Sequence, residues 1–300
     1  MLSFLNMARA RKTDYVDYAL FNRKYVDVAY GNHPREKLDI FLPAGGGPFP
    51  VILQVTGGGW VYGDKSMIKM QEMFLTCLKR GYAVASMNYS LSDQAKFPVP
   101  ILQVKAAIRF LRAHAGQYML DEQNLFLYGN SAGGYLVLMA GYTDERDPFY
   151  DAPRPGQEGV SSAVTAIADV YGITQLAHNR EMILSTGLEP RYYSDDLRSS
   201  EGYFMGFDTR TCPELIMAAS PITYVRPGCP PTLVQHGRMD RTVSVKQSYD
   251  LVQKLLSENE GKVEYEYFDA LDHSDLFFKS EENTNRILDF FDRWRTRRGE

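Results

Sequence analysis

Apolar and polar residues alternate in the first part of the chain and then give way to short continuous apolar runs. Residues 25–30 and 37–42 alternate in part, which is typical of half-buried strands, and Gly31 to Pro34 supply the turn between them. These two segments predict an antiparallel entry to a sheet. Continuous apolar runs, which are typical of strands covered on both faces, follow at residues 51–55, 83–87, 125–128, 164–168 and 232–235.

Helical patterns lie between the apolar runs. The clearest one places Ile101, Val104, Ile108 and Leu111 on one face of a helix. Alternation of strands and helices predicts an α/β fold with a mostly parallel central sheet, antiparallel N-terminal strands and helices on both faces. A chain of 300 residues with 44% hydrophobic residues can bury one large core, so we expect a single domain over residues 1–300.

Two connections are longer or richer in turn residues than a simple loop. Residues 143–161 carry acidic groups, proline and glycine, and are typical of a surface excursion. Residues 174–212 carry many large apolar side chains outside the strand pattern, which either pack on the body of the domain or form a lid over the site. This insertion and the N-terminal residues 1–23 are the two candidate lid or cap segments.

Charge and composition narrow the partners and the compartment. The formal net charge is −4, and the one dense basic cluster, residues 293–298, is typical of a solvated helix end, so we expect no nucleic-acid partner. Three well-separated cysteines favour reduced thiols over a disulfide framework. No run reaches the ~18 apolar residues of a membrane span, and residues 1–7 are too short for a signal peptide. We therefore expect a cytoplasmic protein without a membrane partner, and a homo-oligomer is left open.

The stretch from Gly129 to Gly133 has the pattern G-x-S-x-G between an apolar strand-like segment and an apolar helix-like one. In that context Ser131 lies on a sharp strand-to-helix turn with its hydroxyl exposed. The flanking glycines suit such a turn because a Cβ at either position would clash with the neighbouring strand and helix. Ser131 is therefore the candidate nucleophile.

A serine hydroxyl needs a general base, usually a histidine that a carboxylate orients. Of the five histidines, His273 follows the strand-like residues 263–268 and precedes the last helix, in a loop from which it could reach Ser131. Asp240 follows the penultimate predicted strand and is the candidate acid, although an aspartate there also suits turn formation or helix capping. We expect His236 to shape its turn by hydrogen bonding, with the base role as its alternative.

The glycine-rich run from Thr56 to Trp60 directly follows the strand predicted at residues 51–55. Its glycines let the backbone approach a ligand closely with exposed N–H groups, which an oxyanion needs, whereas a flexible turn is the alternative. Ala132 opens the helix after the serine, where the helix dipole favours negative charge. Trp60 and Tyr62 are candidate substrate-binding residues of an apolar acyl site, although both also suit core packing.

Together these features resemble the α/β-hydrolase carboxylesterases of the hormone-sensitive-lipase-like and acetyl-xylan-esterase-like type, from about residue 24 to residue 295. The resemblance implies that Ser131, Asp240 and His273 form a catalytic triad. It also implies that Gly58, Gly59 and Ala132 supply the oxyanion hole. The matching segments are residues 56–60, 62–64, 88–91, 129–134, 219–222 and 236–240, with His273.

Two positions depart from the pattern of that family. Thr56 stands where the oxyanion motif of relatives usually starts with histidine, and Ser274 follows His273 where a glycine is common. A histidine at the first of these positions helps to fix the glycine loop. A threonine hydroxyl could make a similar hydrogen bond of shorter reach.

The resemblance implies a serine-type hydrolase of short-chain acyl esters, with acetylated oligosaccharides as the hypothesis for the natural substrate. The partner is then a small-molecule ester. We expect no cofactor, because the mechanism needs none and no residues stand at metal-ligand spacing. The same scaffold also serves amide or peptide hydrolases and aryl formamidases. A non-catalytic protein that binds a small ligand is the alternative from another class.

Overall fold

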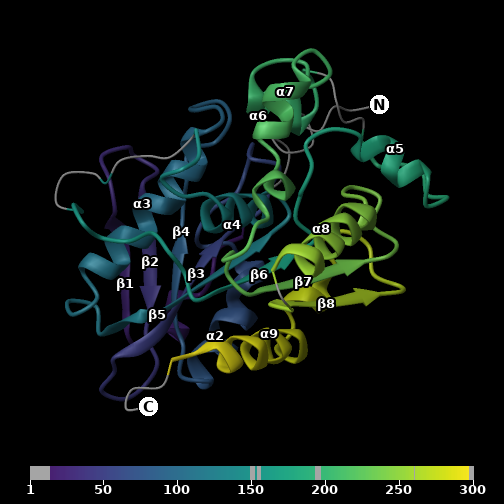
Figure 1. Ribbon diagram of the computed structural model, residues 1–300. Helices are drawn as coiled ribbons and strands as arrows, with labels where there is room; N and C mark the ends of the chain where they lie inside the picture. Colours follow the sequence, from purple (N-terminus) through teal and green to yellow (C-terminus); the bar gives the residue numbers. More distant parts are fainter. Residues whose placement is uncertain (1–13, 149–152, 154–156, 193–196, 260, 297–300) are drawn as a thin grey trace.

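The described residues of the chain build one eight-stranded sheet in the order β1-β2-β4-β3-β5-β6-β7-β8 (Figure 1). The computed structural model describes residues 14–148, 153, 157–192, 197–259 and 261–296. The strands are β1 (Lys24–Ala29), β2 (Lys37–Phe41), β3 (Phe49–Val55), β4 (Ala83–Met87), β5 (Leu120–Asn130), β6 (Ala166–Val170), β7 (Thr232–Gly237) and β8 (Val263–Phe268).

The direction of the strands follows the prediction from the hydrophobic pattern. β1 pairs antiparallel with β2, and β2 pairs antiparallel with β4. The remaining pairs, from β4 through β3, β5, β6 and β7 to β8, are all parallel. The strands in the middle of the sheet are buried along their length, whereas β1 is largely exposed at the edge. The predicted α/β class with antiparallel N-terminal strands is confirmed.

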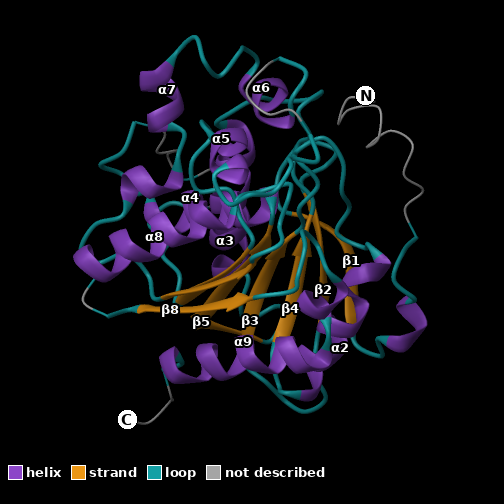
Figure 2. Ribbon diagram, turned by 90° about the vertical axis from the view of Figure 1, so that its right-hand side faces the viewer, coloured by secondary structure: helices purple, strands orange, loops and turns teal. Residues whose placement is uncertain are grey.

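Helices cover both faces of this sheet (Figure 2). α3, α4 and α8 lie over one face, and α2 and α9 pack together over the other. The α-helices are α2 (Gln71–Lys79), α3 (Val99–Ala113), α4 (Ala132–Tyr142), α5 (Asn179–Leu184), α6 (Ser200–Met205), α7 (Pro213–Ala218), α8 (Val245–Glu258) and α9 (Glu281–Trp294). Short 3₁₀ helices are η1 (Tyr18–Leu20), η2 (Ile68–Met70), η3 (Pro221–Tyr224) and η4 (Leu276–Lys279).

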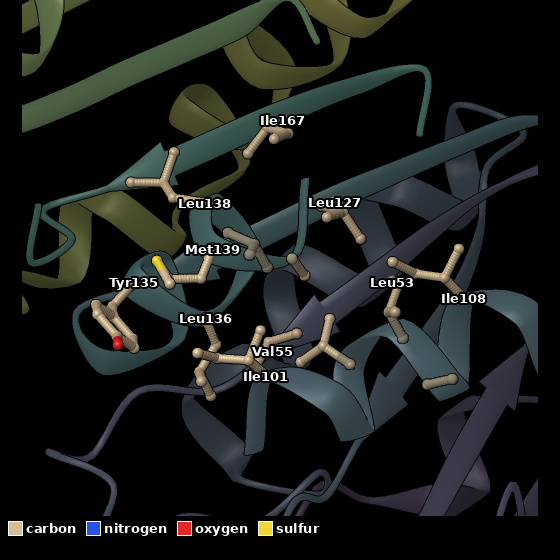
Figure 3. Packing of buried hydrophobic residues seen from close by; sticks show 14 of the residues in the cluster. Leu53, Val55, Ile101, Ile108, Leu127, Tyr135, Leu136, Leu138, Met139 and Ile167 are labelled. Carbon is tan, nitrogen blue, oxygen red and sulfur yellow. The ribbon is translucent and has the colours of Figure 1, made fainter. Parts of the chain in front are cut away.

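The larger core lies between the sheet and helices α3 and α4 (Figure 3). The four apolar positions that predicted a helix face are all buried in α3. α4 is apolar nearly all round and almost wholly buried, which is typical of a helix enclosed by its domain. Burying each large aliphatic side chain contributes about 1.5–3 kcal/mol, so this interface is a main source of stability next to Ser131.

The described part of the N-terminal segment packs on the sheet rather than over the serine. Val16 and Phe21 are buried, and the Phe21 ring lies 4.3 Å from that of Phe41 in β2. The Tyr18 hydroxyl donates to Asp39 Oδ2 at 2.6 Å. None of residues 14–23 lines the cavity that contains Ser131. Residues 1–13, which complete that candidate cap, lie outside the described residues.

The three cysteines are unpaired, as the sequence predicts. Cys77 and Cys229 are buried, and Cys212 is exposed at the start of α7. Burial raises the pKa of the Cys77 thiol to about 12. Within the described part of the chain, no helix combines the length and the apolar character that crossing a bilayer requires.

Candidate active site

Ser131 stands between the end of β5 and the first residue of α4. Its backbone has φ 55° and ψ −127°, which is rare for a residue with a side chain. The neighbouring glycines are required by space: a Cβ on Gly129 would lie 2.3 Å from the Gly133 carbonyl oxygen, and one on Gly133 would lie 2.0 Å from that of Val55. The Ser131 N–H donates to the Val170 carbonyl of β6 at 3.0 Å, which holds the turn against the sheet.

His273 lies in the loop between β8 and η4 and faces the serine. Its Nε2 is 3.0 Å from Ser131 Oγ, and its Nδ1 is 2.6 Å from Asp240 Oδ2. A carboxylate only accepts, so Nδ1 carries the proton and Nε2 is free to accept from the serine hydroxyl. The Tyr171 ring packs edge-on against the imidazole at 4.8 Å between centroids, which limits rotation of the ring.

Asp240 follows β7 and is almost fully buried. Its Oδ1 accepts the backbone N–H groups of Thr242 at 2.8 Å and Val243 at 2.9 Å. Its Oδ2 accepts from both His273, at 2.6 Å, and His236, at 3.1 Å. Burial by itself raises the pKa of Asp240, but the charge and hydrogen bonds of the two histidines outweigh it and hold that pKa well below its usual range.

Asp272 and Asp275, the acidic neighbours of His273 in sequence, bind groups other than the imidazole. Asp272 accepts the His273 backbone N–H at 2.7 Å and pairs with Arg191 Nη2 at 2.5 Å. Asp275 caps η4 through the Phe277 N–H at 2.9 Å. The hydrogen bonds of both carboxylates go to groups other than the imidazole, so Asp240 is the acid that the geometry brings to the base.

The glycine loop after β3 lies beside the serine. Gly57, Gly58 and Gly59 line the same cavity as Ser131. Gly58 has φ 145°, and a Cβ there would lie 2.1 Å from the Tyr62 carbonyl oxygen. Ala132 is the first residue of α4, where a backbone N–H has no partner within its own helix. Of the predicted oxyanion residues, Gly58 and Gly59 thus share the cavity with Ser131, and Ala132 follows it at the start of α4.

Thr56 is fixed by a polar cluster below the glycine loop. The Gln54 amide donates to Thr56 Oγ1 at 2.8 Å, and Ser86 Oγ donates to Gln54 Oε1 at 2.6 Å. The Thr56 carbonyl accepts the Tyr89 hydroxyl at 3.0 Å. Hydrogen bonds with Gln54 and Tyr89 thus anchor the first residue of the loop. This residue is threonine, where relatives usually have histidine.

The cavity above the serine is small, and most of the side chains that line it are polar. Its volume is about 90 Å³, well below the roughly 300–1,000 Å³ of pockets that hold drug-sized ligands. Tyr62, a candidate substrate-binding residue, lines it. Most of the other polar lining was not predicted, because it comes from segments distant in sequence and carries no motif: Lys69, Asn179, Arg191, Tyr192, Ser200 and Glu201.

Trp60 requires a correction, because it does not line this cavity. Its side chain is fully buried. The indole stacks on Phe204 with 4.5 Å between centroids and an angle of 11°, and it meets Tyr135 edge-on at 5.1 Å. The physical reason is that burying so large an apolar surface between α4 and α6 is more favourable than leaving it at a polar cavity. Trp60 is therefore a core residue.

Much of the insertion 174–212 is tied to the body of the domain. Asn179, at the start of α5, donates to the Thr242 carbonyl at 2.8 Å and accepts the Ser244 N–H at 2.9 Å. Phe204 of α6 stacks on Trp60, and its carbonyl accepts the Phe97 N–H at 3.1 Å. Residues 193–196 of this insertion lie outside the described residues. The parts of the insertion around α5 and α6 therefore combine core packing with a position beside the cavity.

The sequence of this chain is similar to a known protein family and to known esterases. The BD-FAE family model matches residues 38–255. Esterase LipC of Mycobacterium tuberculosis is 31% identical over 270 residues, which are 85% of this chain and 61% of LipC. Esterase LipQ of the same organism is 32% identical over 74% of this chain and 50% of LipQ. The chain thus spans only about half to three fifths of the length of these relatives.

Solved structures match over most of the chain. A truncated form of a carbohydrate esterase from gut microbiota has a TM-score of 0.82 and 24% identity, with 94% of this chain and 99% of that chain covered. A bifunctional GH43-CE protein of Bacteroides eggerthii has a TM-score of 0.78 and 26% identity, with 90% of this chain and 35% of that chain covered. Since the family model covers most of the sequence and the fold agrees, this chain belongs to the BD-FAE family of hormone-sensitive-lipase-like α/β-hydrolases.

Proposed function

We propose that the protein is a serine carboxylesterase that cleaves short-chain acyl esters. The observation that carries this proposal is the continuous line of hydrogen bonds from Ser131 Oγ through His273 to Asp240, at 3.0 and 2.6 Å, beside the glycine loop. The esterase names of LipC and LipQ support it. Of the alternatives, amide hydrolysis has no observation that favours it over ester hydrolysis.

Acyl transfer begins when His273 Nε2 takes the proton of Ser131 as the serine oxygen attacks the ester carbonyl. The tetrahedral intermediate places its negative oxygen toward the N–H groups of the glycine loop and Ala132, each worth about 3 kcal/mol in such a site. His273 then returns the proton to the leaving alcohol. Water repeats the cycle on the acyl-enzyme and releases the acid. Asp240 stays ionised throughout and holds the imidazole in the tautomer that this transfer needs.

The natural substrate in this proposal is an acetylated oligosaccharide. A cavity of about 90 Å³ suits a small acyl group better than a long chain. The hydroxyl, amide and charged side chains around it can hydrogen-bond a polyhydroxylated alcohol, and a lipid alcohol offers them no such partners. The structural similarity to a carbohydrate esterase from gut microbiota and to the bifunctional GH43-CE protein supports the same substrate class.

Hydrolysis of p-nitrophenyl acetate by the parent and by Ser131→Ala tests the nucleophile. We expect the substitution to lower kcat by at least about a thousandfold, because only oxyanion stabilisation and binding remain. A fluorophosphonate should label the parent and not the variant. Equal hydrolysis by both proteins would overturn the assignment of Ser131. A parent that neither hydrolyses the ester nor reacts with the fluorophosphonate would leave a non-catalytic binding protein.

A further inference from the structure

We propose that His236 and Ser248 form a positioning pair for the acid of the site, in which His236 holds Asp240 Oδ2 and Ser248 sets the tautomer of His236. This inference rests on the proposed triad and assigns a role to two buried residues that the triad does not use. His236 lies in β7 and Ser248 in α8, and both are fully buried. Neither residue lines the cavity, so the pair acts on the site through its neighbours, of which Asp240 belongs to the triad.

The two histidines of the site share one oxygen. Asp240 Oδ2 is 2.6 Å from His273 Nδ1 and 3.1 Å from His236 Nε2. The other oxygen of the carboxylate already accepts two backbone N–H groups. All the lone pairs of this buried carboxylate that face the protein are therefore engaged, and the carboxylate has a single orientation toward His273.

The tautomer of His236 follows from its neighbours. Nε2 also lies 3.1 Å from the Val243 carbonyl oxygen. The carbonyl and the carboxylate only accept, so Nε2 must carry a proton. Nδ1 is 2.7 Å from Ser248 Oγ, whose hydroxyl can donate to it. With that donor in place, the imidazole presents one N–H to the acid without needing a net charge in a fully buried place.

Sharing Oδ2 affects the base as well as the acid. A second donor on the oxygen withdraws part of the negative charge that would otherwise stabilise protonated His273. Without the His236 donor, the full charge on Asp240 Oδ2 stabilises protonated His273. The acid limb of the kcat/KM profile against pH should therefore move to higher pH. The carboxylate also loses one of its orienting bonds, so kcat should fall.

Other titratable groups face this cluster from the elements packed around it. Asp169 of β6 is fully buried and interacts with His236, and its own pKa is raised to about 7, chiefly by burial. Tyr171 packs on His273, and burial raises the pKa of its hydroxyl well above its ordinary value. Asp272 accepts the His273 backbone N–H and pairs with Arg191. Substitution of Ser248 leaves these groups and their partners in place, whereas substitution of His236 also removes the interaction that lowers the Asp169 pKa. The pH profiles of the Ser248 variants therefore report on the pair without that second effect.

The test compares His236→Leu, His236→Gln, Ser248→Ala and Ser248→Thr with the parent on p-nitrophenyl acetate. His236→Leu removes the donor to Asp240, and we expect kcat to fall about ten- to a hundredfold with little change in KM, the range for losing a hydrogen bond to an ionised group. Glutamine can place an amide N–H near the Nε2 position, so His236→Gln should recover most of the rate and the parent pH profile.

Ser248 keeps the proposal testable if His236→Leu does not fold. Ser248→Ala should lower kcat about two- to tenfold, the range for a neutral hydrogen bond, and Ser248→Thr should restore it. Ser257→Ala is the matched control, because Ser257 lies on the same helix but is exposed. Thermal unfolding and fluorophosphonate labelling give the folded and active fraction of each variant.

The outcomes separate this inference from the proposed function. A folded His236→Leu or Ser248→Ala with the kcat and pH profile of the parent overturns the positioning role, while the parent's activity leaves the esterase proposal intact. A His236→Gln variant as slow as His236→Leu, with unchanged pH profiles in both, also overturns it, because the residue would then act only through packing. An inactive parent would remove the proposed function and this inference together.

Discussion

The backbone has a positive φ at both Ser131 and Trp60, 55° and 58°. The same conformation directs one side chain into the active site and the other into the core. Such a conformation costs of order 1 to 3 kcal/mol and persists only where the surroundings enforce it. Around Ser131 the enforcement comes from two glycines that allow close contact and from the bond to Val170, and the hydroxyl is left facing a cavity. Around Trp60 it comes from aromatic packing, and the side chain is left without access to the cavity.

Substitution of Trp60 and Tyr62 separates packing from substrate contact. Trp60→Ala leaves a void against Phe204 and Tyr135, and we expect it to lower the free energy of unfolding by about 3–5 kcal/mol. Tyr62→Ala should raise KM with a smaller loss of stability, because Tyr62 is half-buried and lines the cavity. Denaturant unfolding and steady-state kinetics measure the two effects. The core assignment would be wrong if Trp60→Ala kept its stability and lost only affinity.

At the scale of elements, the 3₁₀ helix η4 holds the loop between β8 and η4 in place, which carries His273. Lys279 at the end of η4 is buried, and its Nζ lies 3.3 Å from both the carbonyl and the hydroxyl oxygens of Ser274. Ser274 has φ 63°, a conformation that glycine adopts more easily, and relatives commonly have glycine after the base. The lysine therefore supports a backbone shape that the serine does not favour by itself. Burial lowers the pKa of Lys279 to about 7.

Lys279→Met should flatten the dependence of stability on pH. An unfolded lysine titrates near 10.4, so between about pH 7 and pH 10 the unfolded chain holds one more proton than the native protein. Through Lys279 the free energy of unfolding then rises with pH in this window and falls as the pH drops toward 7, with a slope of up to about 1.4 kcal/mol per pH unit. The measurement is urea unfolding at several pH values, with the exposed Lys79→Met as control. An unchanged slope in Lys279→Met would contradict the buried, neutral lysine.

Elements differ in how well the sequence predicted them. Continuous apolar runs in the middle of the sheet located β4 with its observed bounds, because a strand buried on both faces leaves no other pattern. β5 is longer than its apolar run, because its first residues include polar ones that the pattern does not mark. The helices of the insertion 174–212 could not be placed, since their positions depend on contacts such as Phe204 with Trp60, which join residues far apart in sequence.

On the scale of the whole molecule, the site collects loops from one edge of the sheet. The glycine loop follows β3, Ser131 follows β5, Asp240 follows β7 and His273 follows β8. These four strands are parallel, so their carboxyl ends meet at one edge, where ligands bind in open α/β sheets. Motif order along the chain was enough to predict which residues meet there. Most of the polar lining was not predictable, because Arg191, Tyr192 and Glu201 come from an insertion without a motif.

A series of substrates tests the shape of the whole site. We expect kcat/KM for p-nitrophenyl esters to be highest for acetate and to fall steadily beyond butyrate, because a cavity of about 90 Å³ favours a small acyl group. Acetylated xylo-oligosaccharides should release acetate, and the release should be lost in Ser131→Ala. Activity that peaks at octanoate or longer would contradict the short-acyl proposal, while a lack of acetate release would restrict the alcohol to other classes.

Because Cys212 is exposed, a dye on its thiol can report whether the 174–212 insertion moves. Two of the three thiols are sealed in the interior, so a maleimide dye should attach at the start of α7 alone, close to the end of the 174–212 insertion. Fluorescence from that dye during turnover would report whether the insertion stays seated while product leaves or swings outward once per catalytic cycle.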